Sequence, residues 1–231
     1  ADIAKSKAKP GTVDQKIADL YNMGLDSVRL NAEGVAPLKK DIDMLMSVNN
    51  REHLPYALAI IHTCSSNPLF STGVSADLLN STMNVLYIDQ AGIGMGNRDY
   101  YLEAANQALR DGYVQWLTKA FTMLGWESPD AAAEKVLAFE TKMAEAFRSN
   151  VELRNVTANY NAMTKAELLA KYPDFNWNAY FGQMGIGAFD KVIVGQPEVI
   201  EAVIGLYNNE DIETVKTYLA ASVIASAAGY V

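Results

Sequence analysis

The sequence contains very few of the residues that usually bind metals or form disulfides. Among 231 residues there is one cysteine, Cys64, and there are only two histidines, His53 and His62. A single cysteine excludes an internal disulfide and any zinc cluster built from cysteines, because such a cluster needs several thiolates at fixed spacing. The two histidines lie nine positions apart, which matches neither the i, i+3 nor the i, i+4 pair of a helical metal site. We therefore expect no metal site in this chain.

Positive charge is also scarce, and no apolar run is long enough to cross a membrane. Lysine and arginine total 19 against 27 aspartates and glutamates, which gives a formal net charge of -8. Such a field repels phosphate backbones, so nucleic acid is excluded as an expected partner. The longest uncharged apolar run, residues 217–231, is shorter than the ~20 residues that span a bilayer, so we expect no membrane contact by this segment.

The common nucleotide-binding and hydrolase motifs are missing as well. There is no G-x-S-x-G turn and no P-loop. Gly92, Gly94 and Gly96 form G-x-G-x-G, which differs from the dinucleotide fingerprint and instead predicts a loop. Carboxylates are frequent on the predicted helices, for example Glu134 and Glu140, but nothing in the pattern indicates that either is buried. No catalytic residue is therefore expected in this chain.

Half of the residues are apolar, and their spacing predicts a mainly α fold. Helical spacing covers residues 12–34, 37–46, 50–63, 113–124, 128–147, 164–171, 176–184, 197–206 and 210–231. Between residues 68 and 90 the period changes from 3.6 to 2, which predicts a β-hairpin, and residues 191–194 are typical of a further short strand. The sequence has no repeat and no linker. We expect one multi-helical domain over residues 1–231 with a small antiparallel β-hairpin.

Two of the helices carry more specific expectations. Trp116 and Phe121 fall on the apolar stripe of the longest predicted helix, so both are predicted to be buried core residues. The last helix ends in an apolar run without a cap or a charge. Either the chain is cut inside a longer protein, so that Leu219, Val223 and Ile224 need a neighbour outside it, or this helix docks on the chain's own core.

Five segments carry a resemblance to a known family. Residues 90–101 read Q-A-G-I-G-M-G-N-R-D-Y-Y, and residues 152–155 read E-L-R-N. Residues 160–164 read Y-N-A-M-T, residues 175–177 read F-N-W, and residues 192–197 read V-I-V-G-Q-P. In this order, the segments resemble motifs in the non-catalytic half of the neprilysin and endothelin-converting-enzyme family of zinc endopeptidases.

The resemblance covers roughly residues 14–231, with small departures at Asn97 and Asn155, where the family often has acidic residues. It implies a two-lobed peptidase in which a His-Glu-x-x-His helix and a downstream glutamate bind zinc. No such motif occurs in this chain. The resemblance therefore implies a helical lid lobe with no cofactor of its own, while zinc is bound in the parent enzyme. Its expected partner is the C-terminal catalytic lobe of the same polypeptide, and the contact face is expected to include the last helix up to Tyr230.

A lid that covers a catalytic cleft admits oligopeptides and excludes folded proteins. Arg98 and Arg154 are the candidate residues facing the substrate cavity, and ion pairs inside the lobe are the favoured alternative for them. The alternative function is a free-standing helical scaffold that binds peptide or protein; a His-Glu-x-x-His motif in the reading frame beyond Val231 distinguishes the two. The compartment stays open, with an exported form, periplasmic or at the cell surface, preferred to a cytoplasmic one.

Overall fold

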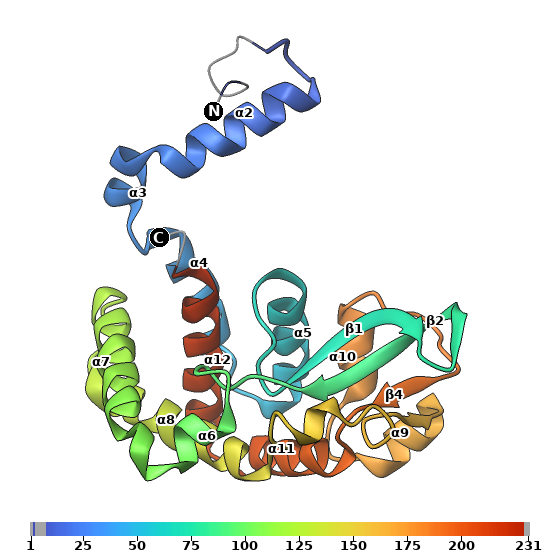
Figure 1. Ribbon diagram of the computed structural model, residues 1–231. Coiled ribbons are helices and arrows are strands. Elements are labelled where there is room, and N and C mark those ends of the chain that lie inside the picture. The colour runs from blue at the N-terminus through green and yellow to red at the C-terminus, as the bar shows by residue number, and fades with distance from the viewer. Residues whose placement is uncertain (1, 3–7, 229–231) are drawn as a thin grey trace.

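Helices make up most of the molecule, and a small sheet lies on one side of them (Figure 1). The computed structural model describes residue 2 and residues 8–228. Its helices are α2 (Val13–Leu25), α3 (Ser27–Glu33), α4 (Ala36–Met46), α5 (Leu54–Cys64), α6 (Arg98–Leu102), α7 (Gln107–Met123), α8 (Pro129–Ala146), α9 (Lys165–Lys171), α10 (Trp177–Gln183), α11 (Pro197–Asn209) and α12 (Ile212–Ala227). Three short 3-10 helices are η1 (Arg51–His53), η2 (Ala104–Asn106) and η3 (Glu152–Arg154), and the strands are β1 (Phe70–Asp77), β2 (Asn80–Gln90), β3 (Asn161–Met163) and β4 (Val192–Val194). The predicted mainly α fold is confirmed.

Side-chain caps explain where several helices begin. Thr164 and Glu167 form a capping box at the start of α9, as the sequence predicts. The single helix expected over residues 12–34 is wrong. The side chain of Asp26 accepts a hydrogen bond from the main-chain N–H of Arg29 at 3.0 Å, and this cap ends α2 and starts α3.

The sheet contains four strands in the order β1-β2-β4-β3, and it is mixed. β1 and β2 form the predicted antiparallel hairpin. β4 pairs in parallel with β2, and β3 pairs antiparallel with β4. The sequence pattern indicates the hairpin and β4 but not β3, because β4 consists of β-branched residues, Val-Ile-Val, whereas β3 reads Asn-Ala-Met and has no strand preference. β1 therefore lies at one edge of the sheet and β3 at the other.

The last helix, α12, is central to the helical part and packs against α4 and α8 (Figure 1). Leu219, Val223 and Ile224 are all buried. The expectation that they need a neighbour outside this chain is wrong, because α4 and α8 supply the packing that the sequence alone does not reveal. Tyr230 lies outside the described residues. No helix in the described part, α12 included, is long and apolar enough to cross a membrane.

The long helix α7 packs against α8 with only part of its predicted apolar stripe buried. Phe121 is fully buried and stacks on Trp126, with 4.4 Å between the ring centroids. Trp116 is 36% exposed and stacks on Tyr113 instead. The core prediction is confirmed for Phe121 and wrong for Trp116. Leu117 and Phe121 set the direction of the buried face, and residue 116 lies beside it.

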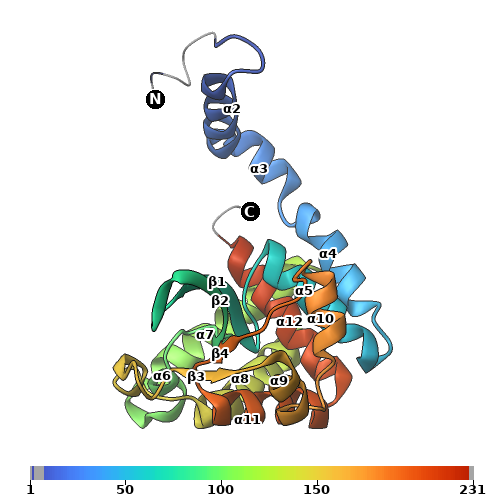
Figure 2. The same ribbon diagram turned by 90° about the vertical axis from the view of Figure 1, so that its right-hand side faces the viewer.

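Helices α2 and α3 form an arm that projects from the rest of the molecule (Figures 1 and 2). In α2 only Ala18 is buried, and α3 has no buried residue. Large apolar side chains are exposed along the arm, namely Val13, Ile17, Leu20, Tyr21, Met23, Leu25 and Val28. Several of them recur at helical spacing, so α2 is amphipathic and its apolar face is left uncovered by the described residues.

Candidate functional site

A buried carboxylate lies beneath the glycine loop, residues 91–97, which joins β2 to α6. Glu140 of α8 is only 3% exposed. The Tyr101 hydroxyl donates to its Oε2 at 2.6 Å, and the Tyr113 hydroxyl donates to its Oε1 at 3.2 Å. The main-chain N–H of Gly94 is a third donor to this carboxylate. One acid therefore holds together α6, α7, α8 and the glycine loop.

Burial raises the pKa of Glu140 to about 7, although the hydrogen bonds from Tyr101 and Tyr113 oppose this shift. Burial, together with the charge of Glu140, raises the pKa of both tyrosines well above their usual range. The acid thus changes charge near neutral pH while its donors stay protonated. Sequence analysis missed this cluster, yet a signal was present, because Glu140 follows buried Val136 by four residues and so shares its face of α8.

Close packing explains two of the glycines in the loop. Gly92 has a φ of +98°, and an added Cβ would lie 2.4 Å from both the Leu69 nitrogen and the Tyr218 hydroxyl. A Cβ on Gly94 would lie 2.1 Å from the Tyr113 hydroxyl. The Tyr218 hydroxyl donates to the Gly92 carbonyl at 2.6 Å and accepts from the Leu69 N–H at 2.7 Å. The G-x-G-x-G pattern therefore serves packing here, not nucleotide binding.

Neither arginine predicted from the sequence lines a hollow described here. Arg98 begins α6 and is half-buried, and its Nε is buried without a hydrogen-bond partner among the described residues. The pKa of Glu152 is lowered first by hydrogen bonds from Ser149 and to a smaller extent by the charge of Arg98. Arg154 is exposed at the end of η3. A role in facing the substrate cavity stays a prediction for both.

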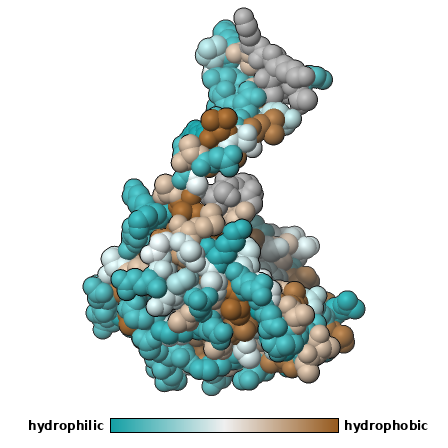
Figure 3. Space-filling model, turned by 90° about the vertical axis from the view of Figure 1, so that its left-hand side faces the viewer, coloured by the Kyte–Doolittle hydropathy of each residue, from teal (hydrophilic) through white to brown (hydrophobic). Residues whose placement is uncertain are grey.

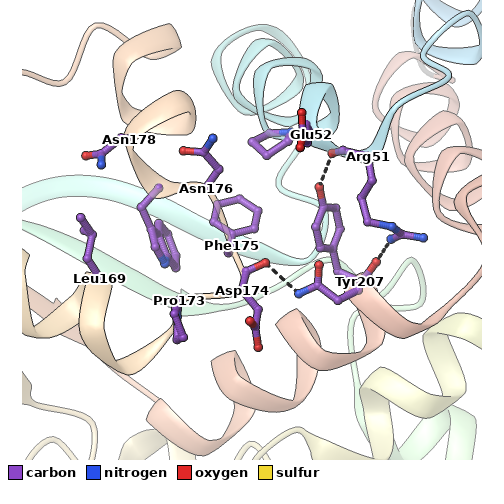
Figure 4. A pocket seen from close by; sticks show the side chains of 12 residues that line it. Arg51, Glu52, Leu169, Pro173, Asp174, Phe175, Asn176, Asn178 and Tyr207 are labelled. Carbon is purple, nitrogen blue, oxygen red and sulfur yellow. Dashed lines mark hydrogen bonds between the residues drawn. The ribbon is translucent and has the colours of Figure 1, made fainter.

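A hollow of about 540 Å³ lies where η1, α10 and the end of α11 meet (Figure 4). Its lining is rich in carboxylates, amides and aromatic rings: Arg51, Glu52, Pro55, Leu169, Pro173, Asp174, Phe175, Asn176, Trp177, Asn178, Tyr207 and Asn208. The guanidinium of Arg51 donates to the carbonyls of Tyr207 and Glu210, so its charge holds the end of α11. Such a lining can bind polar groups through its amides and carboxylates.

The donor set does not fit zinc. Within the described residues, no group of three or more His, Cys, Asp or Glu side chains could hold a metal ion. His62 uses both ring nitrogens: its Nε2 donates to the Pro68 carbonyl at 2.9 Å, and its Nδ1 accepts from the Tyr180 hydroxyl at 2.5 Å. Burial lowers the pKa of His62 to about 4, so the ring is neutral at neutral pH. His53 is exposed.

Comparison with known proteins identifies the family. The sequence model of peptidase family M13 matches residues 1–231, which is the whole chain. The chain belongs to peptidase family M13. Endothelin-converting enzyme 1 of Homo sapiens is 27% identical over 223 residues, covering 90% of this chain and 29% of that protein. The Cavia porcellus enzyme is also 27% identical over 223 residues, covering 90% of this chain and 30% of its own length.

Solved structures agree with this M13 assignment. The zinc metalloprotease Zmp1 of Mycobacterium tuberculosis, in its open state, superposes with a TM-score of 0.93 at 26% identity. The match covers 100% of this chain and 36% of Zmp1. PepO of Lactobacillus rhamnosis shares the fold, with a TM-score of 0.75 at 18% identity. This M13 chain is the N-terminal region of a metallopeptidase, and it spans less than a third of the curated relatives described above.

Proposed function

We propose that this chain is the cap lobe of a zinc-dependent metalloendopeptidase that acts on oligopeptides. One observation carries this function: the entire chain matches the M13 family, while its described residues contain no zinc ligand set. The relative that superposes on the whole chain is a zinc metalloprotease, and this chain covers 36% of it. Zinc and its ligands then belong to the part of the parent polypeptide outside this chain.

The arm supplies a surface for that catalytic part. Figure 3 shows apolar side chains on the part of the arm nearest the body, among hydrophilic ones. In α2, Leu20 is 68% exposed. Apolar surface is stabilised by burial at roughly 25 cal/mol per Å², so a row of such side chains favours a covering partner. The occupant is the catalytic lobe of the same polypeptide, because a complete M13 relative is about three times as long as this chain. The arm, in place of α12, is therefore our candidate for the contact with the catalytic lobe.

A lobe in this position selects substrates by their size and takes no part in breaking the peptide bond. Among the described residues no group of three or more His, Cys, Asp or Glu side chains could hold a metal ion, so we assign this lobe a steric contribution. Held over the catalytic cleft, the lobe leaves room for a flexible peptide and blocks a folded protein. Arg98 and Arg154 are retained as candidate contacts to the peptide.

The complete polypeptide tests this function. We expect it to cleave a fluorogenic decapeptide in a reaction that a chelator abolishes, and to leave intact the same ten residues placed in a surface loop of a folded protein. Equal cleavage of both substrates would contradict a steric cap. A complete polypeptide that purifies without zinc and cleaves neither would support the free-standing scaffold.

Separate expression of the two parts tests the arm. This chain and the remaining polypeptide, produced together as two chains, should assemble and recover chelator-sensitive activity. Leu20→Asp places a charge in the apolar row of α2 and should reduce assembly more than tenfold in size-exclusion and activity assays. Asn22→Asp adds the same charge at an exposed position on the opposite side of α2, so it is the matched control and should assemble normally. Equal behaviour of the two variants would show that the arm is not the contact.

A further inference from the structure

The outer strand of the hairpin offers an open backbone edge. β1 ends the sheet and pairs only with β2 in the described part of the chain. Residues 73–76 of β1 are exposed. The hairpin extends past the helices beside it, as Figures 1 and 2 show. An exposed strand edge presents unpaired N–H and C=O groups, which can pair with another extended chain.

Two residues of β2 show which main-chain groups point away from β1. The N–H of Gln90 donates to Oε1 of Gln196 at 2.7 Å. The carbonyl of Ile88 accepts from the N–H of Gly195 at 2.9 Å. In an antiparallel ladder, residues that exchange hydrogen bonds with their partners alternate with residues that do not. Ile88 and Gln90 therefore do not exchange main-chain hydrogen bonds with their partners on β1.

The partners of these residues on β1 must therefore direct their main-chain groups outward. Thr72 lies opposite Ile88, and Val74 lies opposite Leu86, the next position of the same alternation. The N–H and C=O groups of Thr72 and Val74 face the free edge. β1 also contains no lysine, arginine or proline, the residues that commonly block an edge strand from pairing. Its edge is open as far as Ala76, where the register with β2 shifts.

A hollow of about 460 Å³ adjoins Val74 under the hairpin. It is lined by Val74, Asp77, Asn80, Met83, Asn84, Val85, Leu86, Ile186, Ala188, Phe189, Asp190 and Lys191. Val74 is 67% exposed, and Met83 is exposed beside it. Lys191 forms an ion pair with Asp77, which offsets two of the charges in this lining. Asp190 remains as a further carboxylate, so the hollow disfavours an acidic side chain, and its Val74, Met83 and Phe189 can contact an apolar one.

We propose that β1 binds an extended peptide by strand addition, with main-chain hydrogen bonds to Thr72 and Val74 and an apolar side chain in the adjoining hollow. This interaction rests on the function proposed above and deepens it, because the occupant is the oligopeptide substrate. In strand addition the backbone supplies affinity and the pocket supplies selectivity, so the lobe accepts many sequences and prefers an apolar residue at one position.

The position of the hairpin favours the substrate over the catalytic lobe as occupant. The arm carries the exposed apolar row assigned to the catalytic lobe. In Figures 1 and 2 the hairpin lies in the half of the body from which the arm projects, and the segment before β1 is joined to α12 by a hydrogen bond of 2.7 Å between the hydroxyls of Ser66 and Ser222. A catalytic lobe docked on the arm then lies over the same half of the body as the hairpin, so a peptide on the edge of β1 lies between the two lobes, where the substrate is expected.

Peptide binding to the complete polypeptide tests strand addition without cleavage. The probe is a fluorescein-labelled, uncharged decapeptide of alternating valine and threonine, and binding is followed by fluorescence anisotropy after a chelator has removed the metal. Val74→Pro removes an outward N–H that takes no part in the ladder to β2, so the hairpin is kept. We expect the affinity to fall at least tenfold. The control Val74→Ile keeps the N–H and a β-branched apolar side chain, and it should bind within about twofold of the parent.

The peptide itself provides a second measurement that does not depend on how a variant folds. A decapeptide with N-methyl groups at alternate residues keeps its side chains and loses the donors of one edge. It should bind the parent at least tenfold more weakly. If Val74→Pro is unstable in a thermal melt, Val74→Lys replaces it, because a charged side chain on an edge opposes pairing.

The outcomes separate this interaction from the function it builds on. A polypeptide that cleaves oligopeptides but binds the plain and N-methylated peptides equally well contradicts strand addition alone. Equal binding by the parent and Val74→Pro does the same. A polypeptide with no chelator-sensitive cleavage contradicts the cap-lobe function, and loss of peptide binding in Val74→Pro would still support the open edge.

Discussion

Replacing Glu140 by glutamine tests the buried cluster beneath the glycine loop. The substitution keeps the size and shape of the side chain and removes its ionisation. In the parent, Tyr101, Tyr113 and the Gly94 N–H all donate to the carboxylate, and no basic side chain is among the groups that shift its pKa. Ionised Glu140 is therefore a buried charge held only by neutral donors.

The size of the effect follows from the pKa of Glu140, which burial raises from 4.5 to about 7. One pKa unit corresponds to about 1.4 kcal/mol, so the full shift corresponds to about 3 kcal/mol. Because the folded pKa is higher than the unfolded one, this stabilisation is complete below pH 4.5 and is lost as the pH rises through 7. Raising the pH across this window should lower the free energy of unfolding of the parent relative to that of Glu140→Gln. Buried His62, whose pKa is lowered to about 4, gains stability with rising pH in both proteins and cancels in the comparison.

Chemical denaturation of both proteins at pH 5 and pH 8 measures this difference. We expect the free energy of unfolding of Glu140→Gln, relative to the parent, to increase by about 2 to 3 kcal/mol between the two pH values. Carboxylates with a lowered pKa, such as Asp77 and Glu167, titrate equally in both proteins and cancel in the comparison. A relative stability that is flat with pH would refute the assignment of a raised pKa to this acid.

The remaining predictions concern the core, the loop and zinc. Phe121→Ala should lower the free energy of unfolding by about 3 to 5 kcal/mol in a denaturant titration. Trp116→Ala should lower it by less than half of that, because its ring is partly exposed. Equal losses would show that the buried face of α7 is misassigned. Gly92→Ala should lower the midpoint of thermal unfolding, because the positive φ alone costs about 1 to 3 kcal/mol and the new Cβ would clash with the Tyr218 hydroxyl. An unchanged midpoint would contradict the close packing around Gly92. After dialysis, elemental analysis of this chain alone should find far less than one zinc per molecule, and a fluorogenic peptide should stay uncleaved. One tightly bound zinc per molecule would show that this chain does contain a zinc ligand set.

Features with local causes could be predicted from the sequence. The capping box at Thr164 and the alternating residues of β1 and β2 act within a few residues of chain, so their patterns predicted the observed elements. The break at Asp26 is also local, but it competes with an otherwise continuous helical pattern that conceals it. The parallel pairing of β2 with β4 has no local signature at all.

The errors at the surface and at the site have a common physical reason. Which apolar helix is buried depends on elements that are distant in sequence: α4 and α8 cover α12, while no described residue covers the apolar face of the arm. The apolar run in α12 was therefore correctly found, and of its two interpretations the burial of Leu219, Val223 and Ile224 supports docking on the chain's own core. Glu140 could have been suspected from its place on the face of Val136, but its three donors come from three other segments.

The mixed sheet has a consequence for how the chain folds. The hairpin of β1 and β2 needs only local contacts, but the contact of Gln90 with Gln196 joins positions 106 residues apart. Contacts this distant form slowly, because the intervening chain must lose much of its entropy first. Until β4 arrives, β2 is an edge strand as well, and the hairpin has two open sides instead of one. Refolding yield should therefore fall as protein concentration rises, because copies of the hairpin can pair with each other before β4 docks.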